Sequence, residues 1–350
     1  MTHGGDIYKN DIELDFSVNL NPMGTPVRIR EALTKSVSRA VVYPDRDQAK
    51  ARRAVAEAEA LDTEQVFCGC GASELIMAVV RGEKPETALL YEPVFTGYMH
   101  ALDAFGSRTL HYSIPEDNGF KFTENDLEAI TGDIDMVILC DPVNPTGVSV
   151  PDDFLEAVIE RAKSCGACVL LDESFFTMSD KALENRRSRT SDLIHRYENL
   201  YVIRSLTKLF STPGIRMGYL LTCPSNIEKV RRQLPEWNLP VTSEAGIIAG
   251  MECLLRPGFL IEILGEIDKE RKYLIKELKE MGLEPFESSA PFILFKGPSD
   301  LHERLIKRKI LIRECSDFWG LKDGYFRIAV KNHADNERLI GELRGIVNEL

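Results

Sequence analysis

The middle of the chain alternates short apolar runs with amphipathic stretches, and this alternation constrains the fold more than any other feature. The strand-sized runs are Thr87 to Tyr91, Met136 to Cys140, Cys168 to Leu171, Leu200 to Arg204 and Arg216 to Leu221. Between two of them, apolar residues recur at helical spacing from Asp152 to Ser164. Strands that alternate with helices predict a mainly parallel sheet covered on both faces, which is a three-layer α/β/α domain.

The length of 350 residues exceeds what one hydrophobic core usually organises, so we expect two lobes. We assign residues 45–255 to a large ligand-binding domain. After it, a charged helix (Leu260 to Met281) and short strands (Phe292 to Phe295, Tyr325 to Val330) predict a smaller α+β domain over residues 256–350. The first 26 residues are rich in Asn, Asp, Gly and Pro, which is typical of an extended arm. Residues 1–44 are therefore expected to form that arm and part of the small lobe.

The formal net charge of -12 argues against a nucleic-acid partner, which would require clustered Lys and Arg. A few arginines inside a pocket can still bind phosphate or carboxylate. The residues that follow Met1 show neither a basic nor an apolar signal region, and no apolar run has the length of a membrane span. We expect a cytoplasmic protein with a small-molecule substrate and no membrane partner.

The 8 cysteines include a C-x-C pair, Cys68 and Cys70, and a C-x-x-C pair, Cys165 and Cys168. Such pairs can bind zinc or act in redox chemistry. No histidine flanks either pair at ligand spacing, and free cysteine is a common core residue in reduced compartments. We therefore expect core residues and no metal site.

Polar residues directly follow three of the apolar runs, where ligands bind in parallel sheets. Lys208 lies in the turn after one of them, close in sequence to hydroxyl side chains and to Arg216. Partial desolvation would lower the pKa of its amine and suit it to form a Schiff base, with a phosphate bound alongside. The alternative is a solvated lysine in a loop, and Lys208 alone does not decide between them.

Three further positions support a ligand site. Asp172 follows an apolar strand, and a buried carboxylate needs a partner such as a protonated pyridine nitrogen. Asn144 lies between two prolines, and Gly71 opens a turn into a helix whose free N–H groups can bind an anion. The alternatives are structural: Asp172 would cap the next segment and Asn144 would hold its turn.

Over nearly the whole chain, these motifs occur in the order found in one family. The glycine turn at Gly71 is followed by the aromatic Phe95, the N-P-T-G turn from Asn144, the pair Asp172-Glu173 and Lys208. The chain thus resembles the fold-type I aminotransferase superfamily, whose enzymes use pyridoxal 5'-phosphate (PLP). The resemblance implies the PLP-dependent transferase fold and an enzyme that acts on an amino acid.

The resemblance also assigns roles to residues. Lys208 would bind the cofactor covalently, Asp172 would pair with its pyridine nitrogen, Asn144 would bond the ring oxygen O3′ and Phe95 would stack on the ring. The cofactor phosphate would be held at the turn of Gly71 by Ala72, Ser73, Ser205, Thr207 and Arg216. Tyr43 looks like the tyrosine that reaches this phosphate from the other subunit, which implies a homodimer with shared active sites. Phe175 stands where many relatives carry a Tyr that also bonds O3′, so Asn144 should matter more here, unless Phe175 is simply packing.

Two subfamilies fit, and three stretches favour the L-threonine-O-3-phosphate decarboxylase of cobalamin biosynthesis over histidinol-phosphate aminotransferase. The arm reads H-G-G from His3 and D-F-S-V-N-L-N-P-M-G from Asp15, residues 204–208 read R-S-L-T-K, and residues 310–318 read I-L-I-R-E-C-S-D-F. All three are similar to that decarboxylase, which gives (R)-1-amino-2-propanol phosphate. The aminotransferase, which uses glutamate and 2-oxoglutarate, is the alternative.

The reaction depends on which bond to Cα stands perpendicular to the cofactor ring. Arginines that hold the α-carboxylate in the ring plane favour transamination, whereas arginines that hold a side-chain phosphate allow the carboxylate to leave as CO₂. Arg327 and Arg313 are the candidates, and a guanidinium fork suits either anion. Their structural alternatives are an exposed strand face for Arg327 and an ion pair with Glu314 or Asp317 for Arg313.

Asn21 and His3 are further candidates for substrate binding, although a histidine near a terminus is more often disordered. Ligand-sensing transcription regulators share this fold but carry a winged helix-turn-helix domain ahead of it. The cofactor lobe here is expected to begin almost at Met1, and the chain is acidic. We therefore set that non-enzymatic reading aside.

Overall fold

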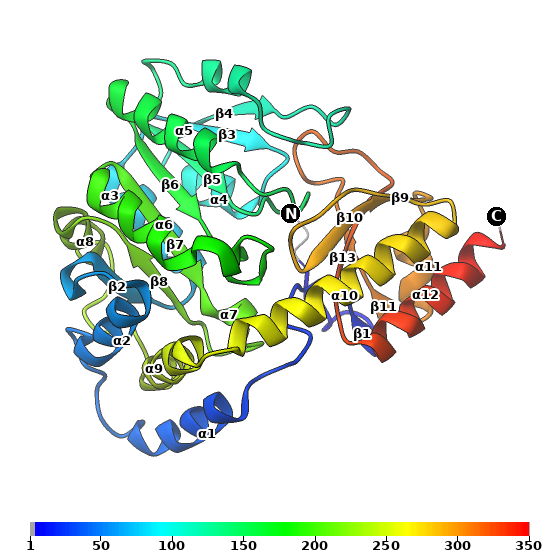
Figure 1. The fold of residues 1–350 in the computed structure, drawn as a ribbon, viewed down its shortest axis with the longest axis horizontal. Helices are drawn as coiled ribbons and strands as arrows, with labels where there is room; N and C mark the ends of the chain where they lie inside the picture. The colour runs from blue at the N-terminus through cyan, green and yellow to red at the C-terminus, as the bar shows by residue number, and fades with distance from the viewer. Residues whose placement is uncertain (1–3, 350) are drawn as a thin grey trace.

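A computed structural model describes residues 4–349, except for the side chains of residues 184–188. Its larger lobe is built on a seven-stranded sheet (Figure 1). In spatial order the strands are β2 (Val66–Gly69), β8 (Gly218–Leu221), β7 (Leu200–Ser205), β6 (Cys168–Asp172), β5 (Met136–Cys140), β3 (Thr87–Glu92) and β4 (Arg108–Ser113). All neighbouring pairs from β7 to β4 are parallel, and β8 is antiparallel to both of its neighbours. The predicted mainly parallel sheet is confirmed.

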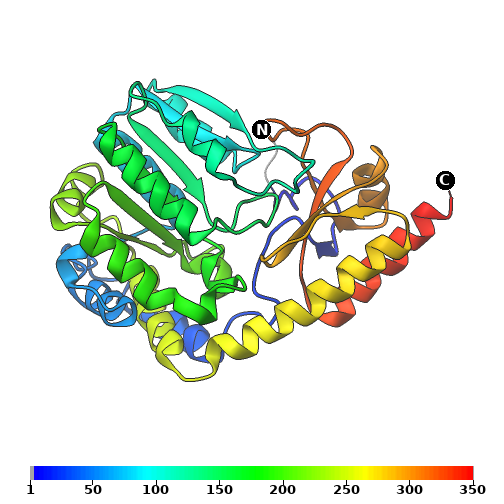
Figure 2. The ribbon, with the colours of Figure 1, turned by 45° about the horizontal axis from the view of Figure 1, so that its top comes forward.

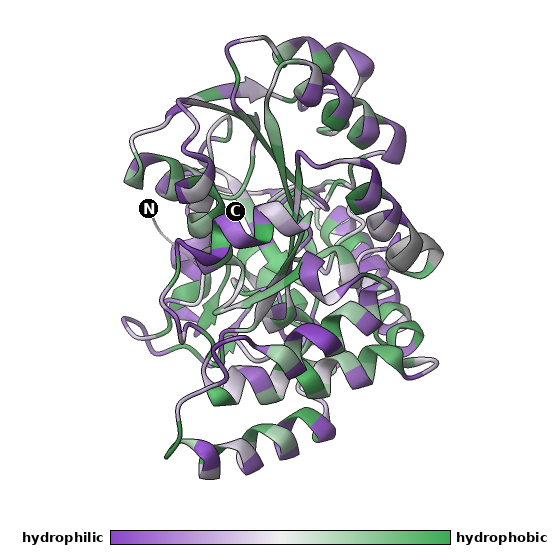
Figure 3. Ribbon diagram, turned by 90° about the vertical axis from the view of Figure 1, so that its left-hand side faces the viewer, coloured by the Kyte–Doolittle hydropathy of each residue, from purple (hydrophilic) through white to green (hydrophobic). Residues whose placement is uncertain are grey.

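Helices cover both faces of this sheet, as the three-layer prediction requires (Figure 1). They are α2 (Ala49–Glu59), α3 (Ala72–Glu83), α4 (Gly97–Ala104), α5 (Asp152–Ser164), α6 (Ala182–Arg196), α7 (Leu206–Leu209), α8 (Pro224–Arg231) and α9 (Val241–Leu255). Figure 3 shows hydrophobic strands at the centre, surrounded by helices that carry both hydrophilic and hydrophobic residues. Among the described residues, no helix is both long enough and apolar enough to cross a bilayer.

The one clear difference in strand bounds lies at Arg216, where a strand was expected to begin. The strand β8 starts two residues later, at Gly218. Arg216 has a φ of 62°, a left-handed conformation that a β-strand does not tolerate. The backbone therefore turns at Arg216 before it enters the sheet.

The smaller lobe contains an antiparallel sheet of four strands and three helices (Figure 2). Its strands, in spatial order, are β12 (Arg313–Glu314), β13 (Tyr325–Ala329), β10 (Phe292–Lys296) and β9 (Glu284–Pro285), and its helices are α10 (Phe259–Glu280), α11 (Leu301–Lys307) and α12 (His333–Val347). The long charged helix and the two longer strands were expected from the sequence. The helix α10 runs from the large lobe along one side of the small lobe in both Figure 1 and Figure 2.

The N-terminal segment lies between the two lobes, where it is the dark blue chain in Figures 1 and 2. Its short strand β1 (Leu14–Asp15) pairs in parallel with β11 (Ile310–Leu311) of the small lobe. Phe16 is fully buried in the small-lobe core, and the next helix, α1 (Val27–Ser36), packs on α9. The domain boundaries after residues 44 and 255 stay a prediction.

All eight cysteines carry free thiols. Among the side chains that the structure describes, no group of three or more His, Cys, Asp or Glu residues is placed to hold a metal ion.

Candidate active site

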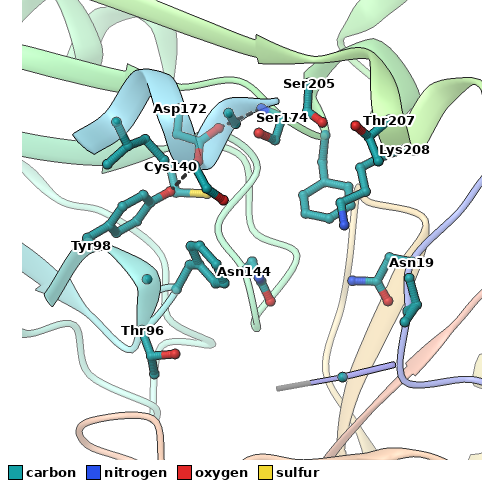
Figure 4. Close-up of a pocket in the computed structure, with 18 of the residues that line it drawn as sticks. Asn19, Thr96, Tyr98, Cys140, Asn144, Asp172, Ser174, Ser205, Thr207 and Lys208 are labelled. Carbon is teal, nitrogen blue, oxygen red and sulfur yellow. Dashed lines mark hydrogen bonds between the residues drawn. The ribbon is translucent and has the colours of Figure 1, made fainter. Parts of the chain in front are cut away.

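A cavity of about 460 Å³ lies at the carboxyl ends of β5, β6 and β7, between the sheet and the small lobe (Figure 4). This is the edge at which parallel sheets bind ligands. Eleven residues expected at the site line it: Ala72, Ser73, Phe95, Asn144, Asp172, Ser205, Thr207, Lys208, Arg216, Arg313 and Arg327. The fold thus brings together residues that lie far apart in the sequence.

Three of the expected residues that the structure describes do not line the cavity. Gly71 borders the cavity without lining it. Tyr43 is 80% exposed, and its ring lies 5.1 Å from that of Trp237, outside the cavity. Asn21 is buried outside the cavity and bonds the backbone of Leu209. His3 lies outside the described residues.

Lys208 occupies the short helix α7, which directly follows β7, and its side chain points into the cavity (Figure 4). Burial, together with the nearby cations Arg327 and Arg216, lowers the pKa of its amine to about 8, against the opposite effect of Asp172. A substantial fraction of the amine is therefore neutral near neutral pH. That is the form that attacks an aldehyde.

Asp172 ends β6 with a buried carboxylate that two donors orient. The Tyr98 hydroxyl donates to Oδ2 at 2.7 Å, and the Ser174 N–H donates to Oδ1 at 2.9 Å. Burial raises the pKa of Asp172, and it forms no ion pair with any cation that the structure describes. A protonated pyridine nitrogen would supply the missing charge, so this position fits the cofactor.

Next to the cavity, the backbone at Gly71 and the guanidinium of Arg216 approach each other closely. Gly71 has a φ of 84°, and a Cβ there would stand 2.8 Å from Nη2 of Arg216. The helix α3 begins at the next residue, so its free N–H groups and Arg216 meet at one point. Arg216 forms no ion pair with a described carboxylate. This cradle fits a phosphate group.

The aromatic residues are arranged around the same cavity. Phe95 lies edge-on to Tyr98, with ring centroids 5.5 Å apart. A Cβ on Gly97 would stand 2.3 Å from the Phe95 ring, so glycine is required for this ring position. Phe175 lines the cavity and packs edge-on against Phe292 at 5.0 Å, and it has no hydroxyl to offer a ring oxygen.

The small lobe contributes Arg327, which is only 6% exposed, so the alternative of an exposed strand face is wrong. Its Nη1 donates to Oδ1 of Asn144 and its Nη2 donates to the Ser17 carbonyl at 2.7 Å. Its Nε has no partner within the described part of the chain, and no described carboxylate pairs with it. Burial lowers the pKa of Arg327 to about 10. With Oδ1 of Asn144 engaged, the Nδ2 of that amide is left to donate into the cavity.

Arg313 also lines the cavity, but it has the ion pair that its structural alternative anticipated. Its Nη2 lies 2.6 Å from Asp317, its Nη1 donates to the Glu314 carbonyl at 2.7 Å, and it stacks on Phe318. Arg313 thus both forms an ion pair with Asp317 and lines the cavity.

The model of the aminotransferase class I and II family matches residues 11–343. The chain belongs to this family. The threonine-phosphate decarboxylase of Salmonella typhimurium is 30% identical to it, over 99% of this chain and 96% of that relative. The histidinol-phosphate aminotransferase of Caldanaerobacter subterraneus is also 30% identical, over 93% of this chain and 91% of the relative. The crystal structure of the histidinol-phosphate aminotransferase from Clostridium acetobutylicum superposes with a TM-score of 0.86 at 28% identity, covering 96% of this chain and all of that one.

This class I and II family member places further polar residues in the cavity that the sequence did not single out. Tyr98 lies one helical turn after Phe95, but nothing in the sequence pairs it with Asp172, 74 residues away. Asn19 and Thr96 line the cavity (Figure 4), and within the described chain their buried Oδ1 and Oγ1 atoms have no hydrogen-bond partner. The N-L-N spacing of the arm could have drawn attention to Asn19 as well as to Asn21.

Proposed function

We propose that this chain is a PLP-dependent decarboxylase of L-threonine-O-3-phosphate, which releases CO₂ and (R)-1-amino-2-propanol phosphate. Pyridoxal phosphate, the cofactor expected for this enzyme, supplies an electron sink for the bond that breaks at Cα. Asp172, Asn144, Lys208 and the cradle of Gly71 and Arg216 would hold it as described above.

The observation that carries the proposal is the pair of guanidinium groups at one end of the cavity. Arg327 is buried without a described carboxylate, and Arg313 faces it from the neighbouring strand. A buried cation without a counter-ion is costly, so a bound anion is expected to lie there. A phosphate accepts more hydrogen bonds than a carboxylate does and can span two guanidinium groups.

With the phosphate at the arginines, the α-carboxylate would be free to stand out of the ring plane and to leave as CO₂. The electron pair of the broken bond stays with the substrate, so Cα must gain a proton. Lys208 Nζ is a suitable donor, because a pKa of about 8 allows it to hold and release a proton near neutral pH.

We further propose a homodimer in which Tyr43 of each chain reaches the cofactor phosphate of the other. The support is an exposed apolar surface around Tyr43, formed with Val41, Val42 and Trp237. Sedimentation should give twice the 39.4 kDa of one chain. The free thiols of the eight cysteines favour a reduced compartment, and we place the enzyme in the cytoplasm.

The second candidate is transamination of histidinol phosphate, favoured by the close superposition with an aminotransferase of that type. The deciding experiment supplies the PLP-loaded protein with L-threonine-O-3-phosphate and measures CO₂ and aminopropanol phosphate. Parallel reactions contain histidinol phosphate with 2-oxoglutarate. Release of CO₂ in equal amount to aminopropanol phosphate supports the proposal. Formation of glutamate from histidinol phosphate, with no CO₂ from threonine phosphate, would overturn it.

A further inference from the structure

The helix that carries Lys208 is capped by a residue almost two hundred positions away in the sequence. The last carbonyls of a helix have no partner within it. At the end of α7, the Lys208 carbonyl accepts from the Asn21 backbone N–H at 3.1 Å, and the Leu209 carbonyl accepts from Asn21 Nδ2 at 2.9 Å. Asn21 therefore binds this four-residue helix through both its backbone and its side chain.

Every polar atom of Asn21 is engaged in holding this turn. Its Oδ1 accepts from the Met23 N–H at 3.0 Å, and its carbonyl accepts from the Gly24 N–H at 3.0 Å and from the Ser211 hydroxyl at 3.0 Å. Asn21 is buried and does not line the cavity. Its side chain is thus committed to the protein and is not presented to a substrate.

Four residues earlier, the same segment contacts Arg327, the arginine proposed to bind the substrate. The Ser17 carbonyl accepts from Arg327 Nη2 at 2.7 Å. Phe16 is fixed to the small lobe, since its N–H donates to the Leu311 carbonyl at 2.7 Å and its carbonyl accepts from the Ala329 N–H at 2.9 Å. Residues 16–21, which we name the strap, therefore connect Arg327 on one lobe to Lys208 on the other.

We infer that Asn21 is a positioning residue, which holds Lys208 at a fixed place relative to Arg327 through the strap and does not bind substrate. An extended chain spans at most about 3.6 Å per residue, so the strap limits how far the two groups can separate. The charged groups that act on the Lys208 amine are Arg327, Arg216 and Asp172. If the strap loosens, Lys208 moves away from the buried position between these groups.

The inference rests on the proposed function, because its test uses the visible absorbance of PLP bound to Lys208. In the loaded Asn21→Ala enzyme, the pH midpoint of that absorbance should rise by at least about 0.5 unit, since less burial and a more distant Arg327 favour the protonated nitrogen. Ser211→Ala removes the hydroxyl that donates to the Asn21 carbonyl and keeps the Ser211 N–H that donates to the Lys208 carbonyl, so it should shift the midpoint in the same direction by less. Asn332→Ala removes a helix cap on α12 from a residue that does not line the cavity, and it serves as the control for lost stability.

An unchanged midpoint in Asn21→Ala, together with a raised KM for L-threonine-O-3-phosphate, would overturn the inference in favour of substrate binding. An equal shift in Asn332→Ala would overturn it in favour of general loosening. If Asn21→Ala does not fold, the pH midpoint of Ser211→Ala is compared with that of the unmodified enzyme instead, and an unchanged midpoint overturns the inference. Absence of the band in the unmodified protein would instead contradict the proposed function itself.

Discussion

Arg313 and Arg327 stand directly opposite each other on the adjacent antiparallel strands β12 and β13. Like charges in such positions repel one another. Arg313 is compensated by Asp317, whereas Arg327 contacts the Asn144 amide oxygen and the Ser17 carbonyl. On the proposed function, an anion bound between the two guanidinium groups would relieve this repulsion.

Replacing Arg327 by lysine should impair catalysis more than the same change at Arg313. Arg327→Lys removes the guanidinium fork from a buried position, and such losses cost about 2–5 kcal/mol, so kcat/KM for L-threonine-O-3-phosphate should fall by about 30-fold or more. Arg313→Lys leaves a cation that can still pair with Asp317, so kcat/KM should fall less in this variant. Steady-state rates of CO₂ release test this order, and the reverse order would assign the main anion contact to Arg313.

Tyr98→Phe should weaken cofactor binding through Asp172. The change removes one of the two hydrogen bonds that orient this carboxylate, which is worth about 0.5–1.5 kcal/mol and corresponds to a 2- to 10-fold higher Kd for PLP. Tyr112→Phe is a matched control, because Tyr112 donates to Asp126 at 2.9 Å outside the cavity. Fluorescence titration of the apo protein measures both values. Equal effects would show that Tyr98 acts on stability alone.

Cofactor uptake should depend on pH through the Lys208 amine. Its pKa is lowered to about 8, and only the neutral amine attacks the aldehyde. The rate of uptake should therefore rise about tenfold per pH unit below pH 8 and level off above it. Arg327→Met removes a cation that lowers this pKa, so the curve should move to higher pH. Uptake by the unmodified protein that still climbs near pH 10 would contradict the account.

A buried network of ion pairs lies at the carboxyl ends of β6 and β7, and its loss should destabilise the fold. Arg204 pairs with Glu59 and Glu173, and all three are almost fully buried. Arg204→Met removes the buried cation that Glu59 and Glu173 share, leaves Glu173 with Arg189 alone as its described ion-pair partner, and should lower the free energy of unfolding by about 3–5 kcal/mol. Arg28→Met, which breaks a pair of exposed side chains with Glu252, should cost about 0–1 kcal/mol. Urea unfolding measures the free energy of unfolding of both variants. Equal decreases would show that the buried network does not stabilise the fold more than an exposed ion pair does.

Sequence reasoning reached the centre of the site because Lys208 and Asp172 each follow an apolar strand, and the carboxyl ends of parallel strands meet at one edge. It could not foresee the left-handed turn at Arg216, since no side-chain pattern marks a positive φ in a non-glycine residue. The bond between Tyr98 and Asp172 depends on how a helix packs over the sheet, which local patterns do not encode. Asn21 was expected to bind substrate, but in the folded chain its amide caps the helix of Lys208 instead.

The role given to Tyr43 depends on a second chain, and the exposed position of its ring leaves that role a prediction. For the same reason, the pattern of a single chain does not encode whether two chains associate. The local sequence pattern also does not decide the reaction, because Arg327 and Arg313 can each bind either the α-carboxylate or the side-chain phosphate of a substrate.

The most direct test of the central claim is borohydride reduction of the PLP-loaded protein, followed by digestion and mass spectrometry. Reduction makes the bond between cofactor and lysine permanent, so the phosphopyridoxyl label should be found on Lys208 and should vanish in Lys208→Ala after dialysis. Lys181, which bonds the Val150 carbonyl outside the cavity, should carry no label. A label on any other lysine, or a visible band that Lys208→Ala retains, would contradict the account.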